Sequence, residues 1–347
     1  MPAGFLTDWA ACGRLDRPPH ESCYLELPED FGRRFAVFVD TEEEFDWTRP
    51  LSRESRSTKS AESLPDIHRR FKSQDVRPVY LVDHPIATDD RCVAMLRQFQ
   101  EDGECAVGTQ LHPWVNPPFE ERVGGANSYA GNLPEALERA KLTVLTETIE
   151  EGFGRRPIVY RAGRYGVGPN TAGILRDLGY EADVSVRALF DYSGESGPDF
   201  SAVKPLPYRI GDGALLEVPL GAAYVGPLRR KGRGLYRAAG RIPHMRGALA
   251  RSGLLQRVAL TPEDMTLAEV TSAIDVMIDD GVRLFSISFH SPSVEPGHTP
   301  YVRDQADLDI FHAWWDGIFD HLARLGIAPA SLDEILAAAK RAGPLAG

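Results

Sequence analysis

Acidic, imidazole and guanidinium side chains recur at the ends of short apolar runs in this chain. Asp40 ends the run FAVFVD, His112 ends ECAVGTQLH and His290 ends RLFSISFH, while Arg161 lies near the end of PIVYRAG. Carboxylates and imidazoles bind divalent metals and transfer protons, and a guanidinium keeps a neighbouring carboxylate charged. These residue types predict metal-assisted hydrolysis if the fold brings the ends of the runs together.

The spacing of the acids suggests separate roles for them. Asp40 and Glu42 stand two residues apart in VDTEEEFDW, so both face the same side if this segment is extended. Glu42 and His112 are expected to hold a metal ion and to leave positions open for water and substrate. Asp40 is then the base that takes the proton of the water. We expect Arg161 to orient Asp40 and His290 to protonate the leaving group.

The elements that would position these residues alternate along the chain. Seven apolar runs predict strands, namely 35–40, 77–83, 104–112, 157–163, 180–186, 214–220 and 283–290. Helical periodicity occupies 87–103, 133–154 and 261–281, and the last of these is predicted to begin with a capping box from Thr261 to Asp264. Alternating strands and helices predict a parallel sheet, and about seven units predict an α/β fold closed into a distorted (β/α)7-type barrel. Catalytic groups of such barrels lie at the carboxyl ends of the strands.

Composition and charge restrict the class of protein. The chain has 347 residues, of which 43% are hydrophobic and 26% charged, as in ordinary globular proteins. No transmembrane segment and no secretory signal are recognisable, so we expect a cytoplasmic protein. The net charge of −11 argues against general nucleic-acid binding. The four cysteines show no CxxC spacing and are expected to be reduced thiols.

The sequence predicts one principal domain. Residues 1–33 are interpreted as a lead-in and residues 34–347 as the barrel, with an insertion at about 187–260. Within it, residues 227–253 carry eight basic side chains and almost no acids. This basic segment is expected to bind a phosphorylated handle on a nucleotide- or lipid-linked sugar, because it follows ALLEVPL, whose strand end should face the same rim as His112. Peripheral contact with an anionic membrane and an ordinary solvated face are the alternatives.

About five motifs in order, over roughly residues 33–335, resemble the polysaccharide deacetylases of carbohydrate esterase family four, which include the NodB-like proteins. VDTEEEFDW resembles the first motif, GTQLHPW the second, YRAGRYG the third and FSISFHSPS the last. The resemblance implies a distorted (β/α) barrel that removes acetyl groups from sugars with a divalent metal, often zinc. It implies the same roles for Asp40, Glu42, Arg161 and His290. The tail SPSVEPGHTPYVRDQADLD looks like a sub-group of cytoplasmic-type homologues, in which His298 follows the acid histidine.

The second motif departs from the family pattern. The family normally supplies H-x-x-x-H, but the positions four residues either side of His112 are Gly108 and Asn116, and position 110 is Gln110. The third metal ligand is therefore an amide oxygen of Asn116 or a water molecule, or Gln110 supports the site from behind. An amide oxygen is a weaker ligand for zinc than imidazole is.

Six further residues are expected to contact the substrate: Trp47, Asp83, His84, Trp114, Tyr165 and His298. The tryptophans could stack on a sugar or simply pack, and Asp83 with His84 could line the pocket or cap a helix. The predicted function is a metal-dependent sugar N-deacetylase. The alternatives are a hydrolase of another small amide or cyclic imide, and a non-catalytic carbohydrate-binding relative.

Overall fold

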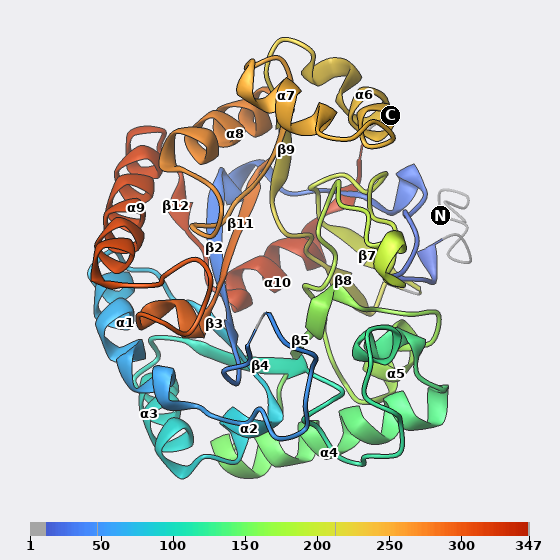
Figure 1. Cartoon of the computed structure of the whole chain (residues 1–347), viewed down its shortest axis with the longest axis vertical. Coiled ribbons are helices and arrows are strands. Elements are labelled where there is room, and N and C mark those ends of the chain that lie inside the picture. The colour runs from blue at the N-terminus through green and yellow to red at the C-terminus, as the bar shows by residue number, and fades with distance from the viewer. Residues whose placement is uncertain (1–11, 47, 212, 346–347) are drawn as a thin grey trace, which may run out of the picture.

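A curled sheet forms the centre of the computed structural model, which describes residues 12–46, 48–211 and 213–345 (Figure 1). The strand order is β11-β2-β3-β4-β5-β6-β8-β7, and β12 also pairs with β2. Neighbouring strands are parallel except β7 and β8. The bounds are β2 (Arg34–Thr41), β3 (Val79–Val82), β4 (Ala106–Leu111), β5 (Val159–Ala162), β6 (Ala182–Asp183), β7 (Tyr208–Ile210), β8 (Leu215–Glu217), β11 (Leu284–His290) and β12 (Ala328–Pro329).

The sheet closes on itself through a few single backbone hydrogen bonds between strand β11 and the segments that follow β8 and β10. These bonds do not form a continuous strand pairing. The backbone N–H of Gly221, just beyond β8, donates to the carbonyl of Ser286 in β11 (3.1 Å). Leu260 N–H donates to Gly221 O (2.9 Å), and Ser288 N–H donates to Leu260 O (3.1 Å). A Cβ at Gly221 would lie 2.9 Å from the Ser286 carbonyl, so the close approach requires glycine. The prediction of a distorted (β/α) barrel is confirmed.

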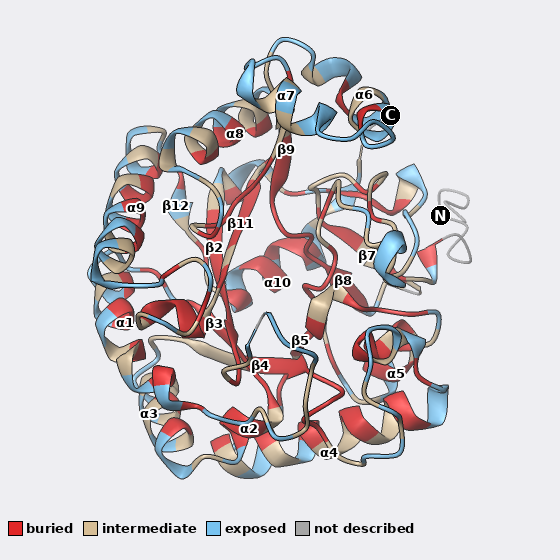
Figure 2. Ribbon diagram, viewed as in Figure 1, coloured by how far each residue is buried: buried red, intermediate tan, exposed pale blue. Residues whose placement is uncertain are grey.

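Helices surround the sheet and close one of its ends. The outer helices are α1 (Leu64–Lys72), α2 (His84–Ala87), α3 (Asp90–Glu101), α4 (Glu135–Phe153), α5 (Thr171–Asp177), α8 (Leu267–Asp279) and α9 (Gln305–Arg324). Their inner faces are buried and their outer faces exposed (Figure 2). Helix α10 (Leu332–Arg341) packs Leu332, Ile335 and Leu336 into the barrel interior beside Phe38 and Leu81. The interior is thereby filled at that end, and the opposite end stays accessible.

Strand β2 shows how the pattern of the sequence positions the site. Phe35, Val37 and Val39 pack outward into the layer between sheet and helices, whereas Ala36 and Phe38 belong to the interior cluster. Successive side chains of a strand point to opposite faces, so Asp40 continues the inward series. An acid is therefore placed inside the barrel mouth at the end of an apolar strand.

Two elements lie elsewhere than the sequence predicted. Each of the seven predicted strand runs contains an observed strand, but the capping box at Thr261–Asp264 is wrong. Helix α8 begins after Thr266, whose hydroxyl accepts from the Glu269 N–H while the Glu269 carboxylate reaches back. The segment 187–260 contributes β7 and β8 to the sheet before it forms the hairpin β9 (Ala222–Val225) and β10 (Gln256–Ala259). Helices α6 (Gly232–Ala239) and α7 (Met245–Arg251) extend from that hairpin at the top of Figure 1.

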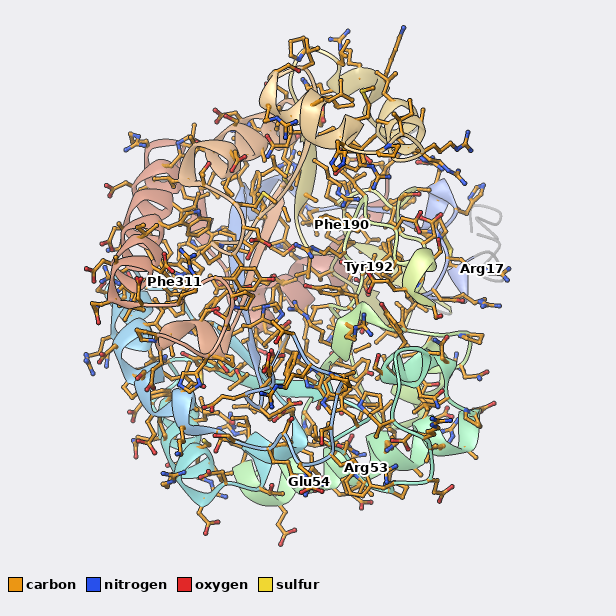
Figure 3. All side chains as sticks on the ribbon, in the orientation of Figure 1. Arg17, Arg53, Glu54, Phe190, Tyr192 and Phe311 are labelled. Carbon is orange, nitrogen blue, oxygen red and sulfur yellow. A yellow bond between two sulfur atoms is a disulfide. The ribbon has the colours of Figure 1, made fainter. Side chains whose placement is uncertain are left out.

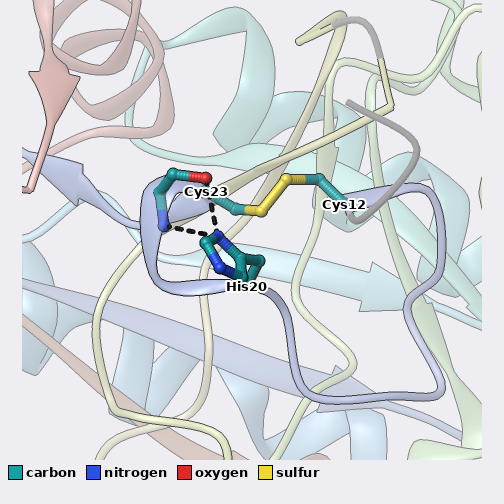
Figure 4. The surroundings of a disulfide bond; sticks show 4 residues. Cys12, His20 and Cys23 are labelled. Atoms are coloured by element: carbon teal, nitrogen blue, oxygen red, sulfur yellow. Dashed lines mark hydrogen bonds between the residues drawn. A yellow bond between two sulfur atoms is a disulfide. The ribbon is translucent and has the colours of Figure 1, made fainter. Parts of the chain in front are cut away.

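The N-terminal lead-in is packed against the barrel. Strand β1 (Leu25–Glu26) pairs with β13 (Gly343–Pro344), so the two ends of the described chain run side by side. Cys12 and Cys23 form a disulfide in this segment (Figure 4). The expectation of four reduced thiols is therefore wrong for this pair, because the chain turns back between the two residues and buries both sulfurs. Cys92 and Cys105 are free thiols. No helix in the described ranges combines the length and apolarity needed to cross a bilayer.

Candidate active site

A cavity of about 590 Å³ lies at the carboxyl ends of the strands. Acidic, amide, imidazole and phenol side chains meet in its wall, among them Asp40, Glu42, Gln110, His112, Tyr165 and His290. The strand register explains the meeting, because His290 of β11 is the direct neighbour of Asp40 in β2. The same register pairs Gln110 of β4 with Arg161 of β5.

Asp40 is held between a guanidinium and an imidazole. Its Oδ1 atom forms an ion pair with Nη1 of Arg161, and its Oδ2 atom lies 3.7 Å from Nε2 of His290. Arg161 is fully buried and also donates from Nε to the Val184 carbonyl (3.0 Å). Because Arg161 holds Oδ1, the other oxygen of Asp40, Oδ2, faces the side of the cavity where His290 lies.

His112 is fixed by an acid that the sequence did not single out. Its Nδ1 atom lies 2.7 Å from Oε2 of Glu43, and its Nε2 atom lies 3.5 Å from Oε2 of Glu42. The Trp114 indole N–H donates to the other oxygen of Glu43 (2.7 Å), and its ring stacks on the imidazole at 4.3 Å. Burial raises the pKa of Glu43 to about 8. Trp114 therefore positions His112, and with 2% of its surface exposed it offers little area to a ligand.

His290 has a matching support on the opposite side of the cavity. Its Nδ1 atom lies 2.7 Å from Oε2 of Glu263, and its backbone N–H donates to the other Glu263 oxygen (3.1 Å). Burial by itself lowers the pKa of this imidazole, but the charges of Glu263, Glu42 and Asp40 outweigh burial and raise the pKa to about 10. The raised pKa favours the protonated, cationic form of His290 at neutral pH.

Glu42 has an oxygen that points to no protein group. Gln110 Nε2 donates to Oε2 of Glu42 (3.1 Å), whereas Oε1 is buried without a hydrogen-bond partner in the described part of the chain. Burial raises the pKa of Glu42 to about 7, opposed by the charges of His290 and His112. A buried carboxylate with an unsatisfied oxygen is costly unless a proton or a cation completes it.

Comparison with solved structures identifies the fold. The chain matches Puue allantoinase over 99% of its own length and 100% of the other, with a TM-score of 0.53 and 15% identity. It matches a Pseudomonas aeruginosa PAO1 protein, described as a probable polysaccharide deacetylase, over 95% and 97% of the two chains, with a TM-score of 0.50 and 16% identity. The chain has the polysaccharide deacetylase fold. No family model and no curated protein matches its sequence.

The donor set at the mouth of this deacetylase fold suits a divalent cation. Oxygen and nitrogen atoms of Asp40, Glu42 and His290 lie within 4.8 Å of one another, and His112 faces Glu42 from the other side. Among the described residues, Arg161 is the one permanent cation in contact with these acids. Each imidazole has its Nδ1 atom fixed by a carboxylate, which is the support usually found behind histidines that bind metals. The residues present therefore fit a metal ion.

Several predicted site residues lie outside the cavity. Asp83 is buried behind His112 and caps α2, accepting from Ile86 N–H (2.9 Å) and from Glu43 N–H (2.8 Å). The cap explains its position, and its neighbour His84 is turned away from the cavity in the first turn of α2.

Asn116 and His298 are also directed elsewhere. The Asn116 amide nitrogen donates to the carbonyls of Lys141 (3.0 Å) and Pro117 (2.6 Å), and its Oδ1 atom, the expected ligand, is buried without a hydrogen-bond partner in the described chain. Asn116 is not among the residues that line the cavity or group with its metal donors. His298 lies against Glu44, with Nδ1 at 3.2 Å. Trp47 lies outside the described residues.

The basic segment 227–253 does not reach this cavity. None of its described residues lines the wall, and Arg229 instead pairs with Asp279 (3.3 Å) and Asp280 (2.9 Å). The end of β8, which precedes the segment, lies on the same side of the sheet as the end of β4, since both strands belong to the parallel series β4-β5-β6-β8. The chain then turns at Gly221 into the β9–β10 hairpin. That hairpin carries α6 and α7 away from the strand ends (Figure 1).

Proposed function

We propose that this protein is a metal-dependent amide hydrolase whose substrate is an N-acetylated sugar. The observation that carries the proposal is the symmetrical support of two imidazoles. His112 and His290 each have Nδ1 against a carboxylate and Nε2 toward an acid of the cavity, at 3.5 Å from Glu42 and 3.7 Å from Asp40. Such an arrangement provides one imidazole for holding a cation and one for moving a proton.

Glu42 and His112 would hold the cation, and the mixture of imidazole and carboxylate favours zinc. When bound, the cation supplies Lewis acidity, which polarises the acyl carbonyl and lowers the pKa of water. Gln110 orients Glu42 through its amide N–H. The unsatisfied Oε1 atom of Glu42 gives this residue the vacant acceptor that a ligand needs.

Proton transfer is assigned to the other pair. Asp40 would take the proton of the attacking water at Oδ2, because Oδ1 is occupied by Arg161. His290 would deliver its Nε2 proton to the leaving nitrogen, and Glu263 keeps the imidazole charged until that transfer. The partly exposed tyrosines of the wall, Tyr165 and Tyr192, offer flat apolar faces with hydroxyl groups, which suit a sugar ring.

The proposal is tested by replacing one residue of the proton-transfer pair and one residue of the metal-binding pair. Asp40→Asn is expected to keep bound metal and to lose most acetate release from an N-acetylated sugar, because the base is removed and the ligands remain. His112→Ala is expected to lose both. Metal content is measured by elemental analysis and acetate by a coupled assay. An Asp40→Asn protein with the parent's turnover would remove Asp40 as the base.

The alternative substrate class is a cyclic amide. The full-length match to an allantoinase favours it, since both chains are covered almost completely. Allantoin supplied in place of the acetylated sugar distinguishes the two, because ring opening releases no acetate. A protein that binds metal weakly and hydrolyses neither substrate would agree with a non-catalytic carbohydrate-binding relative.

A further inference from the structure

Arg187 brings a guanidinium that has no ion-pair partner among the described residues to the wall of the cavity. Three arginines line the wall: Arg49, Arg164 and Arg187. Arg49 lies 3.1 Å from Asp46, and Arg164 lies 2.7 Å from Glu195. Arg187 forms no ion pair with any carboxylate in the described ranges. Of the three arginines in the wall, Arg187 is therefore the one whose positive charge a bound ligand can neutralise.

The guanidinium is held in place by aromatic rings. Its central carbon lies 4.1 Å from the ring centroid of Phe190 and 5.3 Å from that of Tyr165. Nη1 donates to the Tyr192 hydroxyl (3.3 Å), and the Tyr192 ring stacks on both Tyr165 and Phe190, at 5.5 and 6.1 Å. Phe190 and Tyr192 lie beside each other near the middle of Figure 3. The aromatic packing orients Arg187 without consuming its charge.

The backbone explains why this charge faces the site. Asp183, Ser185 and Arg187 alternate along the chain from β6, and the first two are buried against the interior near Arg161. Arg187 is the next residue of this alternation, so its side chain points to the same face as those of Asp183 and Ser185. Its backbone forms a parallel bridge with Leu220. It therefore enters the mouth from the side opposite β2.

We propose that Arg187 binds a carboxylate on the substrate, so that the enzyme acts on N-acylated sugars that carry an acid group. This inference rests on the proposed hydrolase function. A guanidinium presents paired N–H donors that match a carboxylate, and the Tyr192 hydroxyl can add its own hydrogen. One guanidinium without an ion-pair partner matches a monoanion. A phosphate dianion would meet stronger repulsion from Asp40 and Glu42 in the same wall.

The test compares an acid with its neutral ester. The substrates are the methyl glycoside of 2-acetamido-2-deoxyglucuronic acid, its methyl ester, and the methyl glycoside of N-acetylglucosamine 6-phosphate. For the parent, kcat/KM is expected to be about tenfold to hundredfold higher for the acid than for the ester, the effect of one charge-assisted contact. Arg187→Gln is expected to bring that ratio close to one, and Arg187→Lys to restore part of it.

Arg49→Gln is the matched control, because it removes an arginine of the same cavity that already has an acid partner. It is expected to keep most of the preference for the acid. A ratio that Arg187→Gln leaves as high as in the parent would overturn the inference, as would a preference for the phosphate. A parent that hydrolyses acid and ester equally well would also reject the carboxylate subsite, while the hydrolase function would stand.

Calorimetric binding to metal-free protein separates the two proposals from each other. The parent is expected to bind the acid at least about tenfold more tightly than the ester. Arg187→Gln is expected to bind the acid and the ester with equal affinity. If this holds and no substrate is hydrolysed after metal is added, the anion subsite stands and the hydrolase function falls. Equal binding of acid and ester would reject the subsite regardless of turnover.

Discussion

Single residues of this site work in pairs, in which one side chain acts and a second holds it. Glu43 fixes His112 and Glu263 fixes His290, each at 2.7 Å from Nδ1. The acting residue His290 could be predicted from sequence because it ends an apolar strand. Its holder could not, because Glu263 lies 27 residues away in a loop where it resembles any solvated acid.

The His290–Glu263 pair predicts a specific pH dependence. Burial lowers the pKa of His290, but the surrounding acids, Glu263 foremost, raise it, so its acid function is complete below the raised pKa and is lost as pH rises through it. Glu263→Gln removes the largest charge that raises this pKa. The alkaline limb of kcat is therefore expected to move down by about one unit or more.

Ser293→Ala is the control for this prediction, because Ser293 donates to Glu263 (2.6 Å) without contributing charge. It is expected to move the limb less than Glu263→Gln does. The measurement is a kcat profile with saturating metal. An alkaline limb that stays in place in Glu263→Gln would argue that His290 is not the acid.

At the scale of elements, the loop after β4 depends on a helix that covers it. Lys141 of α4 is fully buried, and its ammonium donates to the carbonyls of Pro113 (2.9 Å), Asn116 (2.6 Å) and Pro118 (2.7 Å). It also lies 3.1 Å from Glu121. The strand and helix α4 were predictable from periodicity. The interaction was not, since a lysine within a helix normally reaches solvent.

Replacing that lysine should destabilise the loop and the site together. Lys141→Met leaves three carbonyls without their donor and removes the cation 3.1 Å from the Glu121 carboxylate, so the free energy of unfolding is expected to fall by about 3–5 kcal/mol. Arg139→Met on the same helix breaks two surface ion pairs and is expected to cost less than about 1 kcal/mol. Urea unfolding measures both. Equal losses in the two variants would contradict this role for Lys141.

At the scale of the whole molecule, buried carboxyl groups outnumber buried lysines and arginines in the part of the chain that the structure describes. Glu138 is a clear example outside the catalytic cavity, because burial raises its pKa from 4.5 to about 7 while the Thr171 hydroxyl donates to it. The protonated form is favoured in the folded state. Its contribution to stability is therefore complete below pH 4.5 and is lost as pH rises through about 7.

Glu138→Gln is expected to abolish this loss. Relative to the parent, the variant should gain about 3 kcal/mol of unfolding free energy between about pH 4.5 and pH 8, the equivalent of the pKa shift. Glu147→Gln, which removes another exposed acid of the same helix, is the control and should leave the pH dependence as in the parent. Unfolding is measured with chelator present, so that metal binding does not add to the result. Parallel pH profiles for Glu138→Gln and the parent would refute the assignment.

Because β1 pairs with β13, the order of the elements along the chain could be changed without changing their arrangement in the fold. Leu25 lies opposite Pro344, and Leu345 N–H donates to the Tyr24 carbonyl (2.8 Å). A short linker could therefore join Leu345 to Tyr24 once the residues before Tyr24 are removed, and the chain could be reopened between Arg241 and Ile242, an exposed position in the segment joining α6 to α7. Such a circular permutant would keep every strand neighbour of the barrel, and with it the geometry on which Asp40 and His290 depend.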